Sequence, residues 1–378
     1  MVRKFLNKKA TPSPIAAVGL MMAVTFLTSC INNPPPEDDP PSLGAVNIAV
    51  AVTDYSAGNF EIISTDDYTV TQNMRSGLHG DLAVRGFGKD VYILERMGKD
   101  NILKYNSQSM RSSRKPVYNK SLGAGLNIHD IVAVSAAKAY ISCNNSKNLI
   151  IIDPAAGSEI KKIDLSDFAP DGQEHPFASS LAVYGKYVYA ACQRLDASDM
   201  FLPPADFGLI AVIDIDTDEI AGSIGLEKKN PQAISIFGGK LLVASAGDWM
   251  DPTTGGIEII DLTSDLVPST LIDGIFSDII FVSEDKAYIA VGKVSADWTQ
   301  FWTEIIPFNP LTGAVGAKID GIADAGGAMA YHDGKLYVGD RGVGSAGVAV
   351  VNTANNTVDQ TIRTGVLPPV GLAVFLAD

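Results

Sequence analysis

Short apolar runs recur along the chain at regular intervals, and each unit of the recurrence has the same internal order. Each central run is preceded by a tight turn and, before the turn, by another short apolar run. A third apolar run follows it and ends in Asp or Asn. The central runs are residues 90–94, 138–142, 187–191, 240–244, 286–290 and 335–339, with centres 48, 49, 53, 46 and 49 residues apart.

Each unit predicts four β-strands. The apolar runs are short, rich in β-branched residues and bounded by turn residues, which is typical of strands rather than helices. A weaker fourth run completes the unit, as in residues 219–224 and 357–362. The Asp or Asn after the third run has a side chain that can close the next turn by accepting backbone hydrogen bonds. Four short strands per repeat of ~48 residues predict a β-propeller.

The two ends of the chain predict how the ring closes. Six complete units lie between residues 78 and 365, and three further strands are expected before them. The last apolar run, residues 370–378, supplies one strand of the first type. A seventh blade built from both termini would leave no open sheet edge. The expected fold is therefore all-β: a seven-bladed propeller over residues 44–378, with four-stranded antiparallel blades and the C-terminal strand joining the three N-terminal strands.

The repeat resembles the YVTN-type propeller repeat. Residues 209–224 (LIAVIDIDTDEIAGSI) and 348–374 follow that family's order of strand, Asp, turn, strand, Gly, Pro and strand. The resemblance covers nearly the whole mature chain and implies the propeller fold. It implies no single function, because that family includes binding proteins, lactonases and the propeller subunits of dehydrogenases.

The first 29 residues predict a lipoprotein signal peptide. Basic residues come first, and residues 14–27 are uncharged and mostly apolar, too short a stretch to span a bilayer as a helix. The segment ends Leu27-Thr28-Ser29-Cys30, which resembles the bacterial lipobox, in which the cysteine is diacylated and becomes the new N-terminus. We therefore expect a lipid anchor on Cys30. The alternative is a plain signal peptide followed by an incidental cysteine.

Residues 30–43 predict a spacer between the lipid and the folded domain. Five prolines and three acids follow the cysteine, a composition that does not bury enough apolar surface to fold and that favours extended polyproline II. No aspartate directly follows Cys30, which by resemblance to Gram-negative sorting favours the outer membrane. The expected location is therefore the bacterial cell envelope, with the membrane contacted through the lipid anchor.

The charge of the mature chain argues against a nucleic-acid partner. Removal of the signal peptide takes four basic residues from 29 and leaves 25 against 43 acids, a formal charge of −18. Phosphate binding requires a basic footprint, which a chain of this charge lacks.

Long aromatic loops predict a binding surface on one face. In such propellers the loops between the second and third strands share the face on which the innermost strand begins. Those loops are long in blades four to six, at residues 193–207, 246–256 and 292–303. The candidate ligand-binding aromatics in or beside them are Phe201, Trp249, Trp298, Phe301 and Trp302. Aromatic side chains on loops of a rigid scaffold are typical of binding sites. The alternative is that the loops only cap blades four to six.

Histidines and arginines near the mouth of the channel extend the candidate site. His79 and His129 occupy equivalent positions in adjacent blades, and His175 lies slightly earlier in blade four. They suit channel-lining hydrogen bonds, polar ligand contact or a metal site, but no metal-ligand spacing is present and we assign no metal. Four acids lie in the same connecting zone: Asp81, Asp130, Asp278 and Asp324. Arg194 and Arg341 complete the set of candidate ligand-binding residues.

Two further cysteines, Cys143 and Cys192, also occupy equivalent positions in adjacent blades. Equivalent positions point the same way around the ring, so we expect two buried thiols rather than a disulfide. No Cys–His or Ser–His–Asp arrangement is evident near them, and we assign no catalytic residue and no cofactor.

Three functions fit these features. The leading hypothesis is a lipid-anchored envelope propeller that binds a small ligand or an envelope protein through its aromatic loop face. A second is an enzyme, either a lactonase-like hydrolase or a periplasmic dehydrogenase subunit, which would need His79, His129, Arg194 and Arg341 to converge. The third is a structural envelope scaffold.

Overall fold

A computed structural model describes residues 43–326 and 328–377. The predicted signal peptide, Cys30 and nearly all of the predicted spacer lie outside these described residues. Within the described part of the chain, no helix has the length and apolar character needed to cross a membrane.

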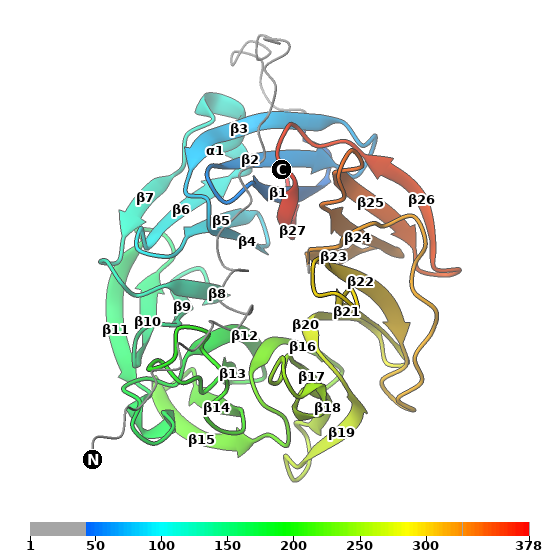
Figure 1. Cartoon of the computed structure of the whole chain (residues 1–378). Coiled ribbons are helices and arrows are strands. Elements are labelled where there is room, and N and C mark those ends of the chain that lie inside the picture. The colour runs from blue at the N-terminus through cyan, green and yellow to red at the C-terminus, as the bar shows by residue number, and fades with distance from the viewer. Residues whose placement is uncertain (1–42, 327, 378) are drawn as a thin grey trace, which may run out of the picture. The chain divides into compact units, whose positions relative to one another are not determined.

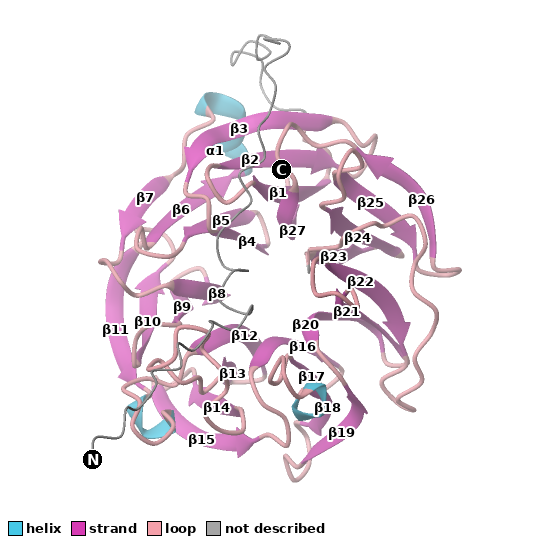
Figure 2. Ribbon diagram, in the orientation of Figure 1, coloured by secondary structure: helices cyan, strands magenta, loops and turns pink. Residues whose placement is uncertain are grey.

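Seven antiparallel sheets form a ring, which confirms the predicted fold class (Figures 1 and 2). Each sheet is one blade, and its strands run in order from the innermost outward. Blade one is β27 (Pro369–Leu376), β1 (Val46–Thr53), β2 (Gly58–Ser64) and β3 (Val70–Leu78). Blade two is β4 (Leu82–Phe87), β5 (Asp90–Glu95), β6 (Asn101–Asn106) and β7 (Tyr118–Ser121). Blade three is β8 (Ile128–Ser135), β9 (Lys138–Cys143), β10 (Asn148–Asp153) and β11 (Ser158–Asp164).

The remaining four blades follow the same order. Blade four is β12 (Ala178–Tyr184), β13 (Tyr187–Cys192), β14 (Leu209–Asp214) and β15 (Glu219–Gly225). Blade five is β16 (Pro231–Phe237), β17 (Lys240–Ser245), β18 (Gly256–Asp261) and β19 (Pro268–Asp273). Blade six is β20 (Phe276–Ser283), β21 (Lys286–Val294) and β22 (Phe301–Phe308), and blade seven is β23 (Met329–His332), β24 (Lys335–Asp340), β25 (Gly347–Asn352) and β26 (Thr357–Ile362). The short helices are α1 (Ser107–Ser113), η2 (Ser166–Phe168) and η3 (Pro252–Thr254).

The C-terminal strand closes the ring as predicted. In Figure 1 the red strand β27 lies beside the blue strand β1, and the two pair antiparallel from Val46 opposite Leu376 to Val52 opposite Pro369. Packing between blades one and seven completes the closure, because Ile48 and Val50 share a buried cluster with Val348 and Val350.

The outer position of blade six is irregular. Instead of a regular fourth strand, the chain makes an isolated bridge between Phe308 and Val315. Two backbone hydrogen bonds continue it, from Gly316 N to Pro307 O (2.8 Å) and from Ile319 N to Ile305 O (2.9 Å). Pro307 has no N–H with which to extend a regular ladder. A Cβ on Gly316 would lie 2.7 Å from Pro307 Cγ, so the two segments approach more closely than a larger residue allows.

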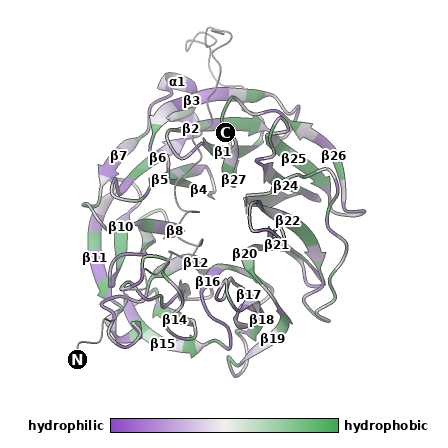
Figure 3. Ribbon diagram, in the orientation of Figure 1, coloured by the Kyte–Doolittle hydropathy of each residue, from purple (hydrophilic) through white to green (hydrophobic). Residues whose placement is uncertain are grey.

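The core consists of apolar clusters that join neighbouring blades. Second strands repeat a buried tyrosine at Tyr92, Tyr140, Tyr189, Tyr288 and Tyr337. Apolar residues occupy the interior strands of each blade, while the outer strands alternate in hydropathy (Figure 3). Burial of apolar surface between blades provides most of the favourable free energy of folding. The scaffold beneath the loops is therefore rigid.

Two local predictions are also confirmed. The Asx residue after the third strand closes the next turn, as when Asp214 Oδ1 accepts from Asp216 N (2.9 Å) and Asn352 Oδ1 accepts from Ala354 N (3.0 Å). Cys143 and Cys192 are free and buried, and burial raises the pKa of each thiol to about 12.

Candidate functional site

Exposed apolar side chains concentrate on the face that carries the loops between second and third strands. Of the 22 large hydrophobic residues that are exposed in the described chain, 12 lie in these loops or in the crossovers on the same face. They are Tyr55, Met97, Met200, Phe201, Leu202, Phe207, Trp249, Met250, Trp298, Phe301, Val343 and Val366. We call this side of the ring the loop face.

A cavity of about 350 Å³ opens on the loop face between blades five, six and seven. We call it the aromatic pocket, because Trp249, Phe301 and Trp302 line it. Its other lining residues are Asn230, Gln232, Ala246, Ile275, Ser277, Gly292, Lys293, Thr303 and Arg341. The rings of Trp249 and Phe301 meet edge to face, with centroids 6.4 Å apart and an interplanar angle of 79°. Four of the predicted candidates, three aromatics and Arg341, thus lie around one cavity.

Hydrogen bonds made by two aspartates and Thr254 fix the loop of blade five around Trp249. Asp248 Oδ1 accepts from Met250 N (2.9 Å), and Asp248 N donates to Thr254 Oγ1 (2.8 Å). Asp251 caps the short helix η3 by accepting from Thr253 N (3.2 Å). These turns fix the backbone on both sides of Trp249, which remains 46% exposed.

The hairpin of blade six supplies the other two rings. Phe301 and Trp302 open β22 and pair with Val294 and Lys293 of β21. The indole Nε1 of Trp302 donates to Glu304 Oε1 (3.1 Å), which fixes the ring orientation. Lys293 Nζ lies 3.9 Å from Glu304 Oε2, so the lysine at the pocket has a nearby counter-ion.

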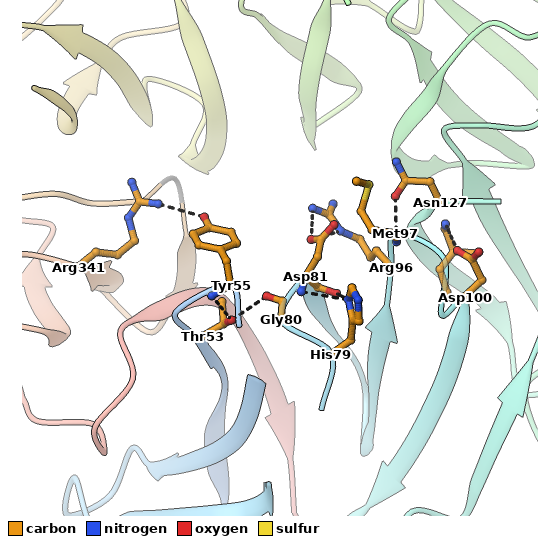
Figure 4. A network of polar contacts seen from close by, with 11 residues as sticks. Thr53, Tyr55, His79, Gly80, Asp81, Arg96, Met97, Asp100, Asn127 and Arg341 are labelled. Atoms are coloured by element: carbon orange, nitrogen blue, oxygen red, sulfur yellow. Dashed lines mark hydrogen bonds and ion pairs between the residues drawn. The ribbon is translucent and has the colours of Figure 1, made fainter. Parts of the chain in front are cut away.

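Arg341 is held by the crossover that leads into blade seven and by the adjacent blade one. Its Nη2 donates to both carboxylate oxygens of Asp324 (3.2 and 3.1 Å), and its Nη1 donates to Tyr55 Oη (3.3 Å). Figure 4 shows Arg341 and Tyr55 pointing toward one another, with Tyr55 next to Thr53. Thr53 Oγ1 accepts from Tyr55 N (2.8 Å) and donates to Gly80 O (2.7 Å). The Nε of Arg341 is buried and has no hydrogen-bond partner among the described residues.

A second cavity, of about 420 Å³, lies among the innermost strands. We call it the central cavity. Its charged or titratable lining residues are Arg85, Arg96, His129, Asp130 and Asp278. Gln232 and Ser277 line both this cavity and the aromatic pocket, so the two adjoin.

An ion pair crosses from blade two to blade three in the central cavity. Arg85 Nε lies 2.6 Å from Asp130 Oδ1. The carboxylate also accepts from Ile131 N and Leu181 N, both at 2.8 Å. Asp130 thus has the guanidinium as its ion-pair partner and two backbone amides as further donors.

Two other groups in the central cavity have shifted pKa values. Burial raises the pKa of Asp278 to about 7. Burial and the positive charges of Arg96 and Arg85 lower the pKa of His129 to about 3, so its imidazole is neutral at pH 7.

The remaining predicted site residues line neither cavity. His79 Nδ1 accepts from Asp81 N (3.1 Å), and the ring of His175 packs on Phe177 with centroids 4.4 Å apart. Arg194 pairs with Asp206 (2.9 Å). Phe201 and Trp298 are exposed on the loop face, by 81% and 50%.

The histidines and arginines that an enzyme would require do not converge in the described structure. His129 lines the central cavity and Arg341 the aromatic pocket, while His79 and Arg194 line neither. The described residues contain no group of three His, Cys, Asp or Glu side chains arranged to hold a metal ion.

The sequence interpretation missed several residues of the two cavities. Asn230, Gln232 and Lys293 line the aromatic pocket, and Arg85 and Arg96 line the central cavity. Asp130 and Asp278 were grouped near the channel mouth in the sequence but not counted among the candidate ligand-binding residues; each precedes an Ile in an innermost strand, a signal that is visible in the aligned repeats. The arginine that pairs with Asp130 carries no such signal, because the register between blades is not visible in sequence.

Comparison with solved structures gives fold likeness at low identity. The hydrazine synthase of Kuenenia stuttgartiensis matches with a TM-score of 0.60 and 15% identity, over 77% of this chain and 88% of that one. Apo AztD from Citrobacter koseri matches with a TM-score of 0.53 and 13% identity, over 88% and 98%. The computationally designed Ika8 protein matches with a TM-score of 0.52 and 11% identity, over 87% and 92%. No protein-family model and no curated protein matches the sequence. These likenesses concern the fold alone.

Proposed function

We propose that this protein is a ligand-binding β-propeller of the bacterial cell envelope. Its aromatic pocket binds a small organic molecule that has a flat apolar face and a hydrogen-bond-accepting group such as a carboxylate. The observation that carries this proposal is the convergence of Trp249, Phe301, Trp302 and Arg341 around one cavity of about 350 Å³. Ligand pockets typically combine an apolar lining with a few polar groups and begin at about 300 Å³.

The lining residues define the chemistry of the ligand. Aromatic rings bind flat apolar surfaces, which sugars and aromatic molecules both present. Arg341 and Lys293 are donors only, and Asn230 and Gln232 add amide groups. Arg341 is pre-organised by Asp324 and Tyr55, which lowers the entropy lost when it binds an acceptor.

The location belongs to the same proposal. We propose that Cys30 carries the lipid and that residues 31–43 space the propeller from the outer membrane. The support is the lipobox-like sequence and the proline-rich spacer. The intact mass of the mature protein tests it: a chain that begins at Cys30 with added acyl groups supports the anchor, and an unmodified cysteine contradicts it.

A protein partner is the second candidate ligand. The observation that favours it is the extent of apolar exposure outside the aromatic pocket, notably Met200 (86%), Phe201 (81%) and Met250 (84%). Contiguous exposed apolar surface commonly marks protein contacts. A Phe201→Ser variant separates the two candidates, because it would weaken a protein contact and leave a pocket ligand unaffected.

The pocket is tested with tryptophan fluorescence. All three tryptophans lie in loops of blades five and six or at their ends, so ligand entry changes the intrinsic emission. A library of acidic saccharides and aromatic carboxylates is titrated against the wild type and against variants. We expect Trp249→Ala and Trp302→Ala each to weaken binding by ~5-fold or more, since stacking contributes about 1 kcal/mol or more.

Trp298→Ala is the matched control, because Trp298 is an exposed tryptophan of blade six that lies outside the aromatic pocket. Its affinity should equal that of the wild type. A ligand whose affinity falls equally in all three variants, or in none, would contradict the proposed site.

A further inference from the structure

The charges of the central cavity balance except at one residue. Arg85 is paired with Asp130 (2.6 Å), and Arg96 Nη2 is paired with Asp81 Oδ1 (2.7 Å). Figure 4 shows the Arg96–Asp81 pair; Asp81 directly precedes β4 and Arg96 directly follows β5. His129 is neutral at pH 7 because burial lowers its pKa. Asp278 alone has no basic side chain as an ion-pair partner among the described residues that line this cavity.

The contacts of Asp278 leave acceptor capacity unused. The hydrogen bond that it accepts is from its own neighbour, Ile279 N to Oδ1 (2.8 Å). A carboxylate has about four lone-pair positions, so further donors can bind. The surrounding residues of the cavity, among them Ser180, Ser235, Ser277 and Gln232, are uncharged.

The position of Asp278 relates it to the aromatic pocket. It lies on β20, directly after Ser277, and Ser277 lines both cavities. A ligand whose apolar part lies against the aromatic rings can therefore direct a further group toward Asp278 past Ser277 and Gln232. This inference rests on the proposed function of the aromatic pocket.

We infer that Asp278 receives the ammonium group of an amine ligand whose apolar part occupies the aromatic pocket. The cavity and its surroundings hold two arginines and three aspartates, so their net charge is −1 when all five are ionised. One bound cation restores neutrality. Asp278 is partly buried, and a desolvated carboxylate without a compensating charge tends to take up a proton. Burial raises the pKa of Asp278 to about 7, and Arg85 and Asp130 act on it in opposite directions. A bound ammonium replaces that proton.

The test compares two probes that differ in one charged group: 2-phenylethylamine and 2-phenylethanol. Both carry the same ring, and only the amine is a cation at neutral pH. Each probe is titrated by tryptophan fluorescence against the wild type at about pH 8, where Asp278 is ionised. The wild type should bind the amine ~10-fold or more tightly than the alcohol, as a charge-assisted hydrogen bond contributes a factor of this size.

Asp278→Asn removes the charge and keeps the shape of the side chain, and its melting temperature reports whether the variant is folded. We expect it to abolish the preference for the amine and to leave the affinity for the alcohol unchanged. Asp320→Asn, an exposed substitution outside both cavities with the same charge change, should keep the wild-type preference. At about pH 6 the wild-type preference should shrink, because Asp278 is then protonated.

The outcomes separate this inference from the proposed function. An amine preference that persists in Asp278→Asn overturns the inference, and so does equal affinity of the wild type for the two probes. Failure of both probes to bind at millimolar concentration also overturns it. The proposed function fails separately, when the affinity for the alcohol or for a library ligand is unchanged by Trp302→Ala.

Discussion

Buried acidic side chains tie the crossovers beneath the loop face to the third strands. Glu61 of β2 accepts from Gly365 N at both oxygens (3.1 and 3.0 Å). Glu258 of β18 accepts from Glu227 N (2.6 Å). Both glutamates are at most 1% exposed, so these hydrogen bonds lie in a low-dielectric interior.

These glutamates predict how stability depends on pH. Burial raises the pKa of Glu61 and of Glu258 to about 7, above the model-peptide value of about 4.3. Their contribution to the free energy of unfolding is therefore fully present below about pH 4.5. It is lost as the pH rises through about 7, because the unfolded chain releases these protons first.

We expect Glu61→Gln and Glu258→Gln to reduce this loss. Glutamine keeps an acceptor for the crossover amide and does not ionise. Thermal melts at intervals between about pH 5 and pH 8 measure the effect, and the fall in Tm over that range should be smaller in each variant and smallest in the double variant. Parallel curves for wild type and double variant would show that the carboxyls do not titrate in this window.

At the scale of residues, the sequence reveals loop aromatics more readily than strand residues. Trp249, Phe301 and Trp302 were predictable, because loop length and aromatic content are visible in the repeat. Lys293 and Gln232 were not, since each occupies a strand whose polar positions look like ordinary solvent-facing residues. The sequence also groups Trp298 with the site, but the cavity linings leave it outside both cavities. The direction of a side chain at a loop tip is not predictable from the sequence, because a loop has no periodic pattern of buried and exposed positions.

Among the elements, β27 connects the end of the chain to its beginning. It pairs with β1 along its length and packs against β4 of blade two. The approach to β4 is close: a Cβ on Gly86 would lie 1.9 Å from Val374 O. Leu372, Ala373 and Phe375 of β27 are buried. The strand thus contributes to the core of blade one and covers the inner edge of β1.

Removal of residues 369–378 should therefore destabilise the whole ring. The truncation exposes the edge of β1 and removes several buried side chains, a loss of several kcal/mol. We expect Tm to fall by about 10 °C or more, or the protein to be insoluble. Thermal melting of the truncated chain is compared with that of a chain lacking only Asp378. Equal melting temperatures of the two chains would mean that β27 contributes no measurable stability to the closed ring.

The sequence predicted the order of elements but not the local departures from it. Asn106 ends a third strand, as predicted, yet it also caps the helix α1 by accepting from Ser109 N (2.8 Å). The repeat also predicts a fourth strand in blade six, and the structure has an irregular segment there. Such details depend on single Pro, Gly and helix-capping residues. These residues differ from one repeat unit to the next, so they are not part of the shared pattern.

The molecule as a whole combines a negative overall charge with cations at one cavity. The chain has a formal charge of −14, and −18 without the predicted signal peptide. The long-range field of such a molecule favours the approach of cations. Arg341 and Lys293 act at short range in the aromatic pocket, and Asp278 acts in the adjoining central cavity. A ligand with both an amine and an acceptor group suits this arrangement.

A substitution at Gly292 tests whether the aromatic pocket itself holds the ligand. A Cβ on Gly292 would lie 3.4 Å from Ile275 Cγ2 and 3.6 Å from Trp249 Cη2, which is ordinary contact, so a small side chain fits and a larger one enters the pocket. The measurement is calorimetric titration of the ligand selected by the fluorescence screen into Gly292→Leu, with Gly292→Ala as the control. We predict that leucine weakens binding by ~100-fold or more at unchanged Tm, while alanine changes it little. Wild-type affinity in a folded Gly292→Leu variant would mean that the ligand does not occupy the aromatic pocket.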